Sequence, residues 1–146
     1  GLLTVSVTQK QSGPGVAEAF TFPLVVDVID AQGEAQRLKL PVDARSRSFA
    51  IPMAGPPARV EVDPDMAVLC KLTLKASRPL LRAALAQGSS VPVRLTAAAA
   101  LLEDGSMEAV SAVCAVAAAD CCERVHGIAT DLARRENTKQ QQKASQ

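Results

Sequence analysis

The sequence predicts a β plus α fold, in which an antiparallel β-sandwich precedes antiparallel α-helical hairpins. Up to about Lys75, apolar and polar residues alternate, which is typical of half-buried strands. From Ser77 onward, apolar residues recur every three or four positions, which is typical of helices. We therefore expect a β-sandwich domain over residues 1–76, a helical segment over 77–136 and a polar tail over 137–146.

The first half predicts six short strands that form a meander. Turn residues at 11–15, 30–33 and 63–65 separate several of them. Pro23 removes one ladder donor, which favours an edge position or a strand start. The expected core-facing residues are Leu3, Val5, Val7, Phe20, Phe22, Leu24, Val26, Val28, Leu38, Leu40, Val42, Phe49, Ile51, Met53, Val60 and Val62, followed in a last strand by Val68, Cys70, Leu72 and Leu74.

The second half predicts four helices with short connections, so neighbouring helices are expected to pack antiparallel. Gly88 is expected to end the first helix. The expected N-caps are Ser77, Ser90, Ser106 and Asp120. The expected apolar stripes consist of Leu80, Leu81, Ala84 and Leu85; Val93, Ala97, Ala98, Leu101 and Leu102; Met107, Val110, Val113, Cys114 and Ala117; and Val125, Ile128, Ala129 and Leu132.

Two arrangements of these helices remain open. A weak repeat, in which the pattern that starts at Arg94 returns from Val125, favours an α-solenoid of paired helices. An alanine-rich helical bundle explains the same pattern. The run 137–146 has no large apolar residue, and it predicts either a solvated helix extension or a disordered tail.

Composition argues against several classes of function. Aromatic residues make up only 2% of the chain, with no Trp and no Tyr, which disfavours a carbohydrate site or a base-stacking platform. The net charge of +1 leaves no electrostatic footprint for nucleic acid. Because no apolar stretch reaches the roughly 18 residues of a membrane span, we expect no membrane partner. We expect a soluble, cytoplasmic fragment of a longer protein.

The sequence predicts no catalytic, cofactor-binding or metal-binding residue. His126 is the only histidine, so a two-histidine metal site cannot form, and we expect a surface or hydrogen-bonded histidine. The four cysteines are Cys70, Cys114, Cys121 and Cys122. Their spacing fits neither paired zinc knuckles nor a C-x-x-C redox motif. They are expected to be reduced thiols that pack as small apolar residues in a reducing compartment.

Two further groups of charged residues have alternative interpretations. Asp63 and Asp65 flank a proline and could coordinate calcium, although a turn-forming role is the better explanation. Arg45, Arg47 and Arg59 could form a basic patch beside the sandwich, but arginines that flank strands usually prevent edge pairing.

A resemblance to a known family rests on Thr8-Gln9, the segment 20–26 (FTFPLVV), the turn at 30–33, Phe49, the segment 60–64 (VEVDP), Val68-Leu69 and the helix that runs from Arg94 to Leu101. In order and spacing, the first half resembles the β-sandwich domain that follows the catalytic domain of zinc aminopeptidases of the aminopeptidase N type. The Arg94 helix is similar to the start of that family's HEAT-like C-terminal superhelix.

The resemblance implies a noncatalytic structural portion of such a metallopeptidase, which links the catalytic domain to the helical cap that encloses the peptide site. In that family an H-E-x-x-H helix with a downstream Glu holds zinc, and a G-x-M-E-N loop recognises the substrate amino terminus. None of these motifs occurs in this chain, so zinc is expected only in the parent catalytic domain. The alternative is a protein-interaction scaffold of the same architecture without peptidase activity, as in a transcription-factor subunit.

The expected partners are the missing catalytic and C-terminal domains, with peptide substrate contacted only indirectly. A solenoid cut after its first helix pairs leaves an apolar end surface, through which the chain would self-associate or bind those domains. The residues expected to form it are Leu101, Leu102, Val110, Val113, Val125 and Leu132. An independent adhesion-type sandwich is disfavoured by the cysteine pattern and the fused helices.

Overall fold

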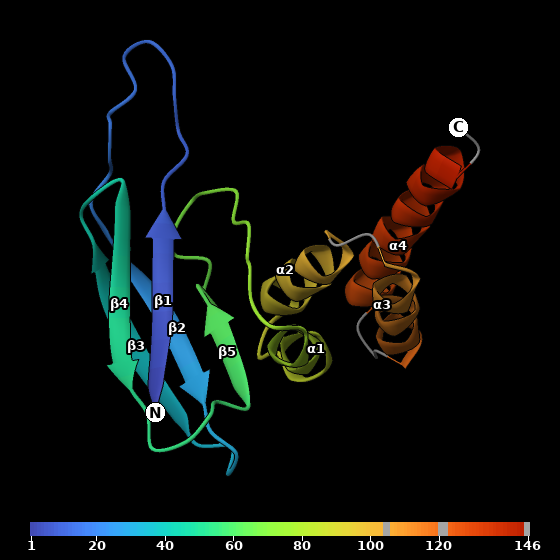
Figure 1. Cartoon of the computed structure of the whole chain (residues 1–146), viewed down its shortest axis with the longest axis horizontal. Helices are drawn as coiled ribbons and strands as arrows, with labels where there is room; N and C mark the ends of the chain where they lie inside the picture. The colour runs from blue at the N-terminus through green and yellow to red at the C-terminus, as the bar shows by residue number, and fades with distance from the viewer. Residues whose placement is uncertain (104–105, 120–122, 145–146) are drawn as a thin grey trace. The chain divides into compact units, whose positions relative to one another are not determined.

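The computed structural model describes residues 1–103, 106–119 and 123–144, and it divides into a β unit, Gly1–Leu69, and a helical unit, Cys70–Gln146 (Figure 1). Antiparallel strands in two sheets precede four helices, which confirms the predicted β plus α fold. The strands are β1 (Leu2–Thr8), β2 (Phe22–Ile29), β3 (Ala35–Val42), β4 (Ser46–Pro52) and β5 (Arg59–Val62). The helices are α1 (Arg78–Gln87), α2 (Val91–Leu102), α3 (Met107–Ala119) and α4 (Glu123–Ala144).

The strands of the β unit form a two-stranded sheet, β1-β4, and a three-stranded sheet, β3-β2-β5. All pairs are antiparallel, and the register pairs Val5 with Phe49 in the first sheet and Val26 with Leu38 in the second. Only β2 and β3 are neighbours in both the sequence and a sheet, so the predicted meander is wrong. The connection of residues 9–21 leads the chain from one sheet to the other, which a tight hairpin turn could not do.

The core of the β unit lies between the two sheets, because alternate side chains of each strand point inward. Its buried residues are Leu24, Val26, Val28, Leu40 and Val42, and the partly buried residues around them include Leu3, Val5, Val7, Phe49, Val60 and Val62. These positions confirm the predicted inward faces. Phe22 is only half-buried, however, and Phe20 precedes β2 and is 52% exposed.

The predicted last strand over residues 68–74 is absent from the structure. Its alternating pattern serves a different purpose, since Val68 packs on the core of the β unit and Leu74 packs on the core of the helical unit. Leu69, between them, is fully exposed. A segment that contributes apolar residues to two separate cores therefore produced a strand-like period without any strand pairing.

The buried side chain of Gln9 joins three parts of the β unit. Its Nε2 donates to the carbonyl oxygens of Phe20 (2.8 Å) and Ala44 (3.1 Å). Its Oε1 accepts from the Phe20 N–H (2.9 Å) and from Nε2 of Gln11 (3.1 Å). All the hydrogen-bonding capacity of the amide is used, which is what allows a polar group to be buried here.

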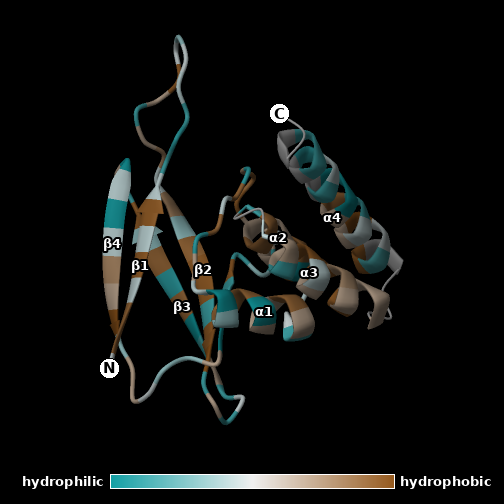
Figure 2. Cartoon of the chain, turned by 45° about the vertical axis from the view of Figure 1, so that its right-hand side comes forward, coloured by the Kyte–Doolittle hydropathy of each residue, from teal (hydrophilic) through white to brown (hydrophobic). Residues whose placement is uncertain are grey.

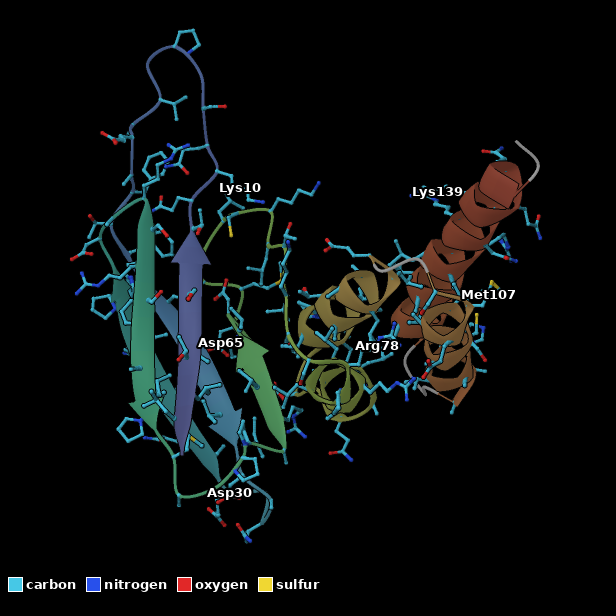
Figure 3. All side chains as sticks on the ribbon, in the orientation of Figure 1. Lys10, Asp30, Asp65, Arg78, Met107 and Lys139 are labelled. Atoms are coloured by element: carbon cyan, nitrogen blue, oxygen red, sulfur yellow. The ribbon has the colours of Figure 1, made fainter. Side chains whose placement is uncertain are left out.

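The predicted turn between β2 and β3 is confirmed. The Gly33 N–H donates to the Asp30 carbonyl oxygen (3.2 Å), and Gly33 takes a φ of 87°, which favours glycine. Oδ1 of Asp30 accepts from the backbone N–H groups of Gln32 and Glu34, at 2.9 Å each. Asp30 is labelled at this turn in Figure 3.

In the helical unit α1 packs against α2 and α3 packs against α4, and α2 also contacts both α3 and α4. The shared core consists of Leu81, Ala84, Leu85, Val93, Ala97, Ala98, Leu101, Leu102, Val110, Val113, Ala117, Ala129 and Ala133, and Val125 is also fully buried. The stripe predicted for α2 is confirmed in full. The expected apolar end surface is wrong, because Leu101, Val113 and Val125 fill spaces between helices and Leu132 is half-buried.

Three predicted stripe residues are exposed instead: Met107, Cys114 and Ile128. In α4 the buried positions follow a spacing of four, through Val125, Ala129 and Ala133, which turns Ile128 outward. Figure 2 shows hydrophilic residues along much of α4 toward its C-terminal end. Because α4 continues to Ala144, the helix extension is the correct alternative for the described part of the tail.

The helices begin at the predicted N-cap residues where these are described, but not every N-cap side chain forms a capping hydrogen bond. Ser106 accepts a hydrogen bond at Oγ from the Ala109 N–H (3.1 Å), as an N-cap does. Ser77 and Ser90 occupy their predicted N-cap positions but make no side-chain cap bond. The predicted cap Asp120 lies outside the described residues.

Gly88 ends α1 as predicted, at a point of very close approach. Its N–H donates to the Ala84 carbonyl oxygen (2.9 Å). A Cβ placed on Gly88 would lie 2.4 Å from that oxygen and 2.8 Å from Cγ1 of Val93 on α2. Glycine is therefore required here by space, because its φ of −56° is accessible to any residue.

We expect Gly88→Ala to lower the free energy of unfolding of the helical unit by about 1–3 kcal/mol, because the methyl group forces α1 and α2 apart. Gly127→Ala is the matched control. Gly127 is exposed within α4 and has no neighbour within 4 Å of an added Cβ, so this change should raise stability by about 0.5–1 kcal/mol. Urea unfolding followed by circular dichroism measures both, and equal effects would contradict the close approach.

We expect Gln9→Ala to lower the free energy of unfolding of the β unit by about 1–3 kcal/mol, because it leaves the Phe20 and Ala44 backbone groups unsatisfied. Gln36→Ala, at an exposed position of β3, should change stability by less than about 0.5 kcal/mol. Denaturant unfolding monitored through β-unit resonances provides the comparison. If the two variants were equally stable, the amide of Gln9 would have no bridging role.

Candidate functional site

His126 lies on the exposed side of α4, where its Nδ1 is 2.8 Å from the Ala117 carbonyl oxygen of α3. The last carbonyl groups of a helix lack partners within the helix, so an imidazole N–H is a suitable donor to them. This confirms the prediction of a surface, hydrogen-bonded histidine. The contact ties the end of α3 to α4.

Cys70 and Cys114 are both exposed, so the prediction that the cysteines pack as small apolar residues is wrong for these two. Cys114 follows the fully buried Val113 and lies one position outside the buried stripe of α3. Cys121 and Cys122 lie outside the described residues. The described thiols come from different segments, the linker before α1 and the middle of α3.

Asp63 and Asp65 have separate structural roles. The Asp63 carboxylate accepts from the backbone N–H groups of Ala67 (2.8 Å) and Val68 (3.0 Å). Asp63 itself has a φ of 47°, a left-handed conformation that Asp tolerates better than most residues. Asp65 instead accepts from Nη1 of Arg37 (2.9 Å). The predicted turn-forming role is confirmed for Asp63, whereas Asp65 forms an ion pair with Arg37.

Arg45, Arg47 and Arg59 each make a contact of their own. Arg45 donates to the Glu18 carbonyl oxygen (3.2 Å). Arg47 pairs with Asp43 and lies 5.6 Å from the ring centroid of Phe49, and its hydrogen bond is the main cause of a lowered Asp43 pKa. Arg59 donates from Nε to Oε1 of Glu61 (2.6 Å). The three arginines thus make separate local contacts on β4, on β5 and in the turn before β4, and the basic patch, one of the two interpretations, is not supported.

The sequence reasoning missed a charged cluster on the outward face of the three-stranded sheet. Arg37 on β3 donates to both carboxylate oxygens of Asp27 on β2, at 2.8 and 2.7 Å, and its pKa is raised chiefly by this contact. In register, Asp27 also lies opposite Glu61, which is 1% exposed. Each acid has an arginine partner, which offsets the repulsion between neighbouring carboxylates.

This cluster is suited to holding strands together, because each carboxylate accepts strong hydrogen bonds in its charged form. A signal for it existed in the sequence. Asp27 stands between Val26 and Val28 in an otherwise apolar run, and Arg37 pairs with it when the turn at 30–33 is used to set the hairpin register. The pairing of β5 with β2 could not be inferred from local pattern.

An open groove of about 520 Å³ runs between α1 and α3, and we call it the α1–α3 groove. It is lined by Arg82, Leu85, Ala86, Glu108, Ser111, Ala112, Ala115 and Val116. Its surface is formed mainly by small apolar side chains, with charge at one end. There Glu108 accepts from Arg78 (3.2 Å) and Arg82 (2.5 Å), which connects α3 to α1. Arg78 and Met107 are labelled on these helices in Figure 3.

The groove has the chemistry of a contact surface. Among its lining residues, Ser111 is the only hydroxyl, and there is no histidine or lysine that could serve as its base. Across residues 1–103, 106–119 and 123–144, no three metal-ligating side chains gather into a metal-binding group. Within the same ranges, none of the helices combines the length and the apolar character needed to span a bilayer.

No protein-family model matches the chain, and no curated protein sequence matches it significantly.

We expect the chain to bind no stoichiometric zinc and to hydrolyse no aminoacyl arylamide, since a single histidine and scattered cysteines cannot supply a zinc ligand set. Metal analysis after dialysis, combined with an arylamide assay, measures both properties. One tightly held zinc per chain, with hydrolysis that a chelator abolishes, would show that this expectation is mistaken.

Proposed function

We propose that this chain is a noncatalytic structural portion of an aminopeptidase N-like zinc metallopeptidase, which links the catalytic domain to a HEAT-like helical cap over the peptide site. The observation that carries the proposal is the order of the two units. A two-sheet β unit leads through a short segment into helices that pack in consecutive pairs, α1 with α2 and α3 with α4. This is the order that the sequence resemblance implies.

The stacking of the helix pairs adds support. Contacts join α1 to α3 and α2 to α4, as in a solenoid where each hairpin packs on the equivalent helices of the next. Small residues at the contacts, including Ala97, Ala98 and Ala129, allow the backbones to approach closely.

The residues that carry the resemblance also have physical roles in the β unit. Gln9 joins β1 to the start of β2, Asp30 forms the β2–β3 turn, and Asp63 orders the segment after β5. A motif made of turn and bridging residues supports a structural domain rather than a catalytic one.

In this proposal the chain links the catalytic domain to the helical cap, and the zinc ion belongs to the parent catalytic domain. Its partners are the catalytic and C-terminal domains of the parent, and peptide is contacted only indirectly. We place the protein in the cytoplasm because the cysteine spacing favours reduced thiols.

The alternative is an interaction scaffold of the same architecture without peptidase activity. The α1–α3 groove favours it, because the accessible surface of Ala86, Ala112 and Val116, with charges at one end, suits a protein ligand. The two functions differ in the parent chain: the scaffold requires no zinc ligands.

We expect the parent protein to contain an H-E-x-x-H helix with a distant Glu on the N-terminal side of β1, to bind one zinc and to hydrolyse aminoacyl arylamides. In that protein Gly88→Ala should lower the temperature at which activity is lost while leaving the zinc content unchanged, because it weakens only the linking module. Gly127→Ala is the control. A parent that retains this architecture without zinc ligands identifies the scaffold, and a parent without any peptidase-like domain contradicts both functions.

A further inference from the structure

We propose that the edge of β1 that faces away from β4, here called the β1 edge, is a strand-addition site for an extended peptide with apolar side chains at every second position. This inference goes beyond the proposed function and does not depend on it. It concerns the β unit alone.

The hydrogen-bond ladder with β4 determines which residues of β1 direct their backbone N–H and C=O groups toward the β1 edge. At one end Met53 N–H donates to the Gly1 carbonyl oxygen (2.9 Å), and at the other Gln9 N–H donates to that of Arg45 (2.8 Å). Antiparallel ladders alternate, so the odd-numbered residues of β1 direct their N–H and C=O groups toward β4. The even-numbered residues Leu2, Thr4, Ser6 and Thr8 therefore direct theirs toward the β1 edge, where the described residues provide no paired strand.

The β1 edge differs from the other sheet edges that the structure describes. Natural proteins block edges with prolines, charges or short strands. β3 carries Arg37, Lys39 and Pro41, β4 carries Arg47 and Pro52, and β5 has only 4 residues, two of them charged. β1 is 7 residues long, with the sequence LLTVSVT, and has neither a charge nor a proline.

The space next to β1 is also apolar. Leu3, Val5 and Val7 point into the core of the β unit yet are only half-buried, whereas Val26 and Val42 in the opposite sheet are completely buried. In Figure 1 the three-stranded sheet extends past β1 at β5, on the side away from β4. The inward-facing Val60 and Val62 of β5 are likewise half-buried. A third strand beside β1 would cover both sets of side chains.

The occupant is a single peptide strand rather than a second copy of the protein. A second copy that paired through its own β1 would bring its three-stranded sheet into the space of β5, because β5 projects beyond β1 (Figure 1). A single strand brings no second sheet with it. Main-chain hydrogen bonds supply affinity at such an edge, and alternate side chains supply specificity.

The sequence of β1 itself provides a suitable probe. In an antiparallel register centred on Val5, Thr4 pairs with Ser6 of the peptide and Leu3 pairs with its Val7, so hydroxyl meets hydroxyl and apolar meets apolar. The same register places the outward backbone groups of Thr4 and Ser6 in hydrogen-bonded pairs. We therefore choose a fluorescent synthetic peptide that carries LLTVSVT between solubilising lysines.

The test uses two matched variants of the whole chain, Ser6→Pro and Ser48→Pro. The two residues lie opposite each other and share a hydroxyl hydrogen bond of 2.8 Å, which both variants lose. Proline at position 6 removes an N–H from the β1 edge, whereas proline at 48 removes one from the outer edge of β4, and neither breaks the β1–β4 ladder. Circular dichroism checks that both variants fold.

Fluorescence anisotropy should show saturable peptide binding to the unmodified chain. Ser6→Pro should raise the dissociation constant at least about tenfold, and Ser48→Pro by less than about twofold. On binding, the amides of Thr4 and Ser6 should become protected from hydrogen exchange, while those of Val5 and Val7 are protected already. The absence of saturable binding, or equal effects of the two prolines, would overturn the proposal. If either variant fails to fold, the amide protection pattern of the unmodified chain decides the question by itself.

Discussion

The β unit depends on one buried amide. Gln9 follows the last residue of β1, and its four hydrogen bonds fix the start of β2 and the turn before β4 at the same point. These bonds close the long connection of residues 9–21, so that β1 and β2 can lie in different sheets with their apolar faces opposed. The half-buried side chains of β1 and its unpaired edge follow from that placement, because among the described strands only β4 pairs with β1.

The sequence correctly predicted those elements whose apolar residues all pack against one core. β2 could be recognised because Leu24, Val26 and Val28 all face one core, and α2 because its whole stripe does. The pattern from Val68 to Leu74 wrongly predicted a strand, because Val68 packs on the core of the β unit and Leu74 on the core of the helical unit. In α4, Ile128 is more apolar than Ala129, yet Ala129 is buried and Ile128 is exposed, because the buried positions are Val125, Ala129 and Ala133. The hydrophobicity of single residues therefore does not identify the buried face of α4.

The candidate site was less accessible to sequence reasoning than the fold. The roles of Asp63 and His126 followed from turn chemistry and from the lack of other histidines, and both agree with the contacts observed. The charged cluster of Asp27, Arg37 and Glu61 required knowledge that β5 pairs with β2, which is a long-range property. The α1–α3 groove likewise lies between two helices that are not consecutive in the sequence, so no local sequence motif predicts it.

The alanine-rich contacts of the helical unit restrict how this protein can change over evolutionary time. Gly88 leaves no room for a Cβ, and Ala97 and Ala98 are completely buried, so nearly every substitution at these positions adds atoms to a close-packed contact and strains it. A core built from large side chains can exchange Leu for Met or Ile at small cost, because volume can be redistributed. Here there is little volume to redistribute. Sequence drift in the helical unit should therefore concentrate on outward-facing residues, and its inner positions should alternate mainly among glycine, alanine and serine.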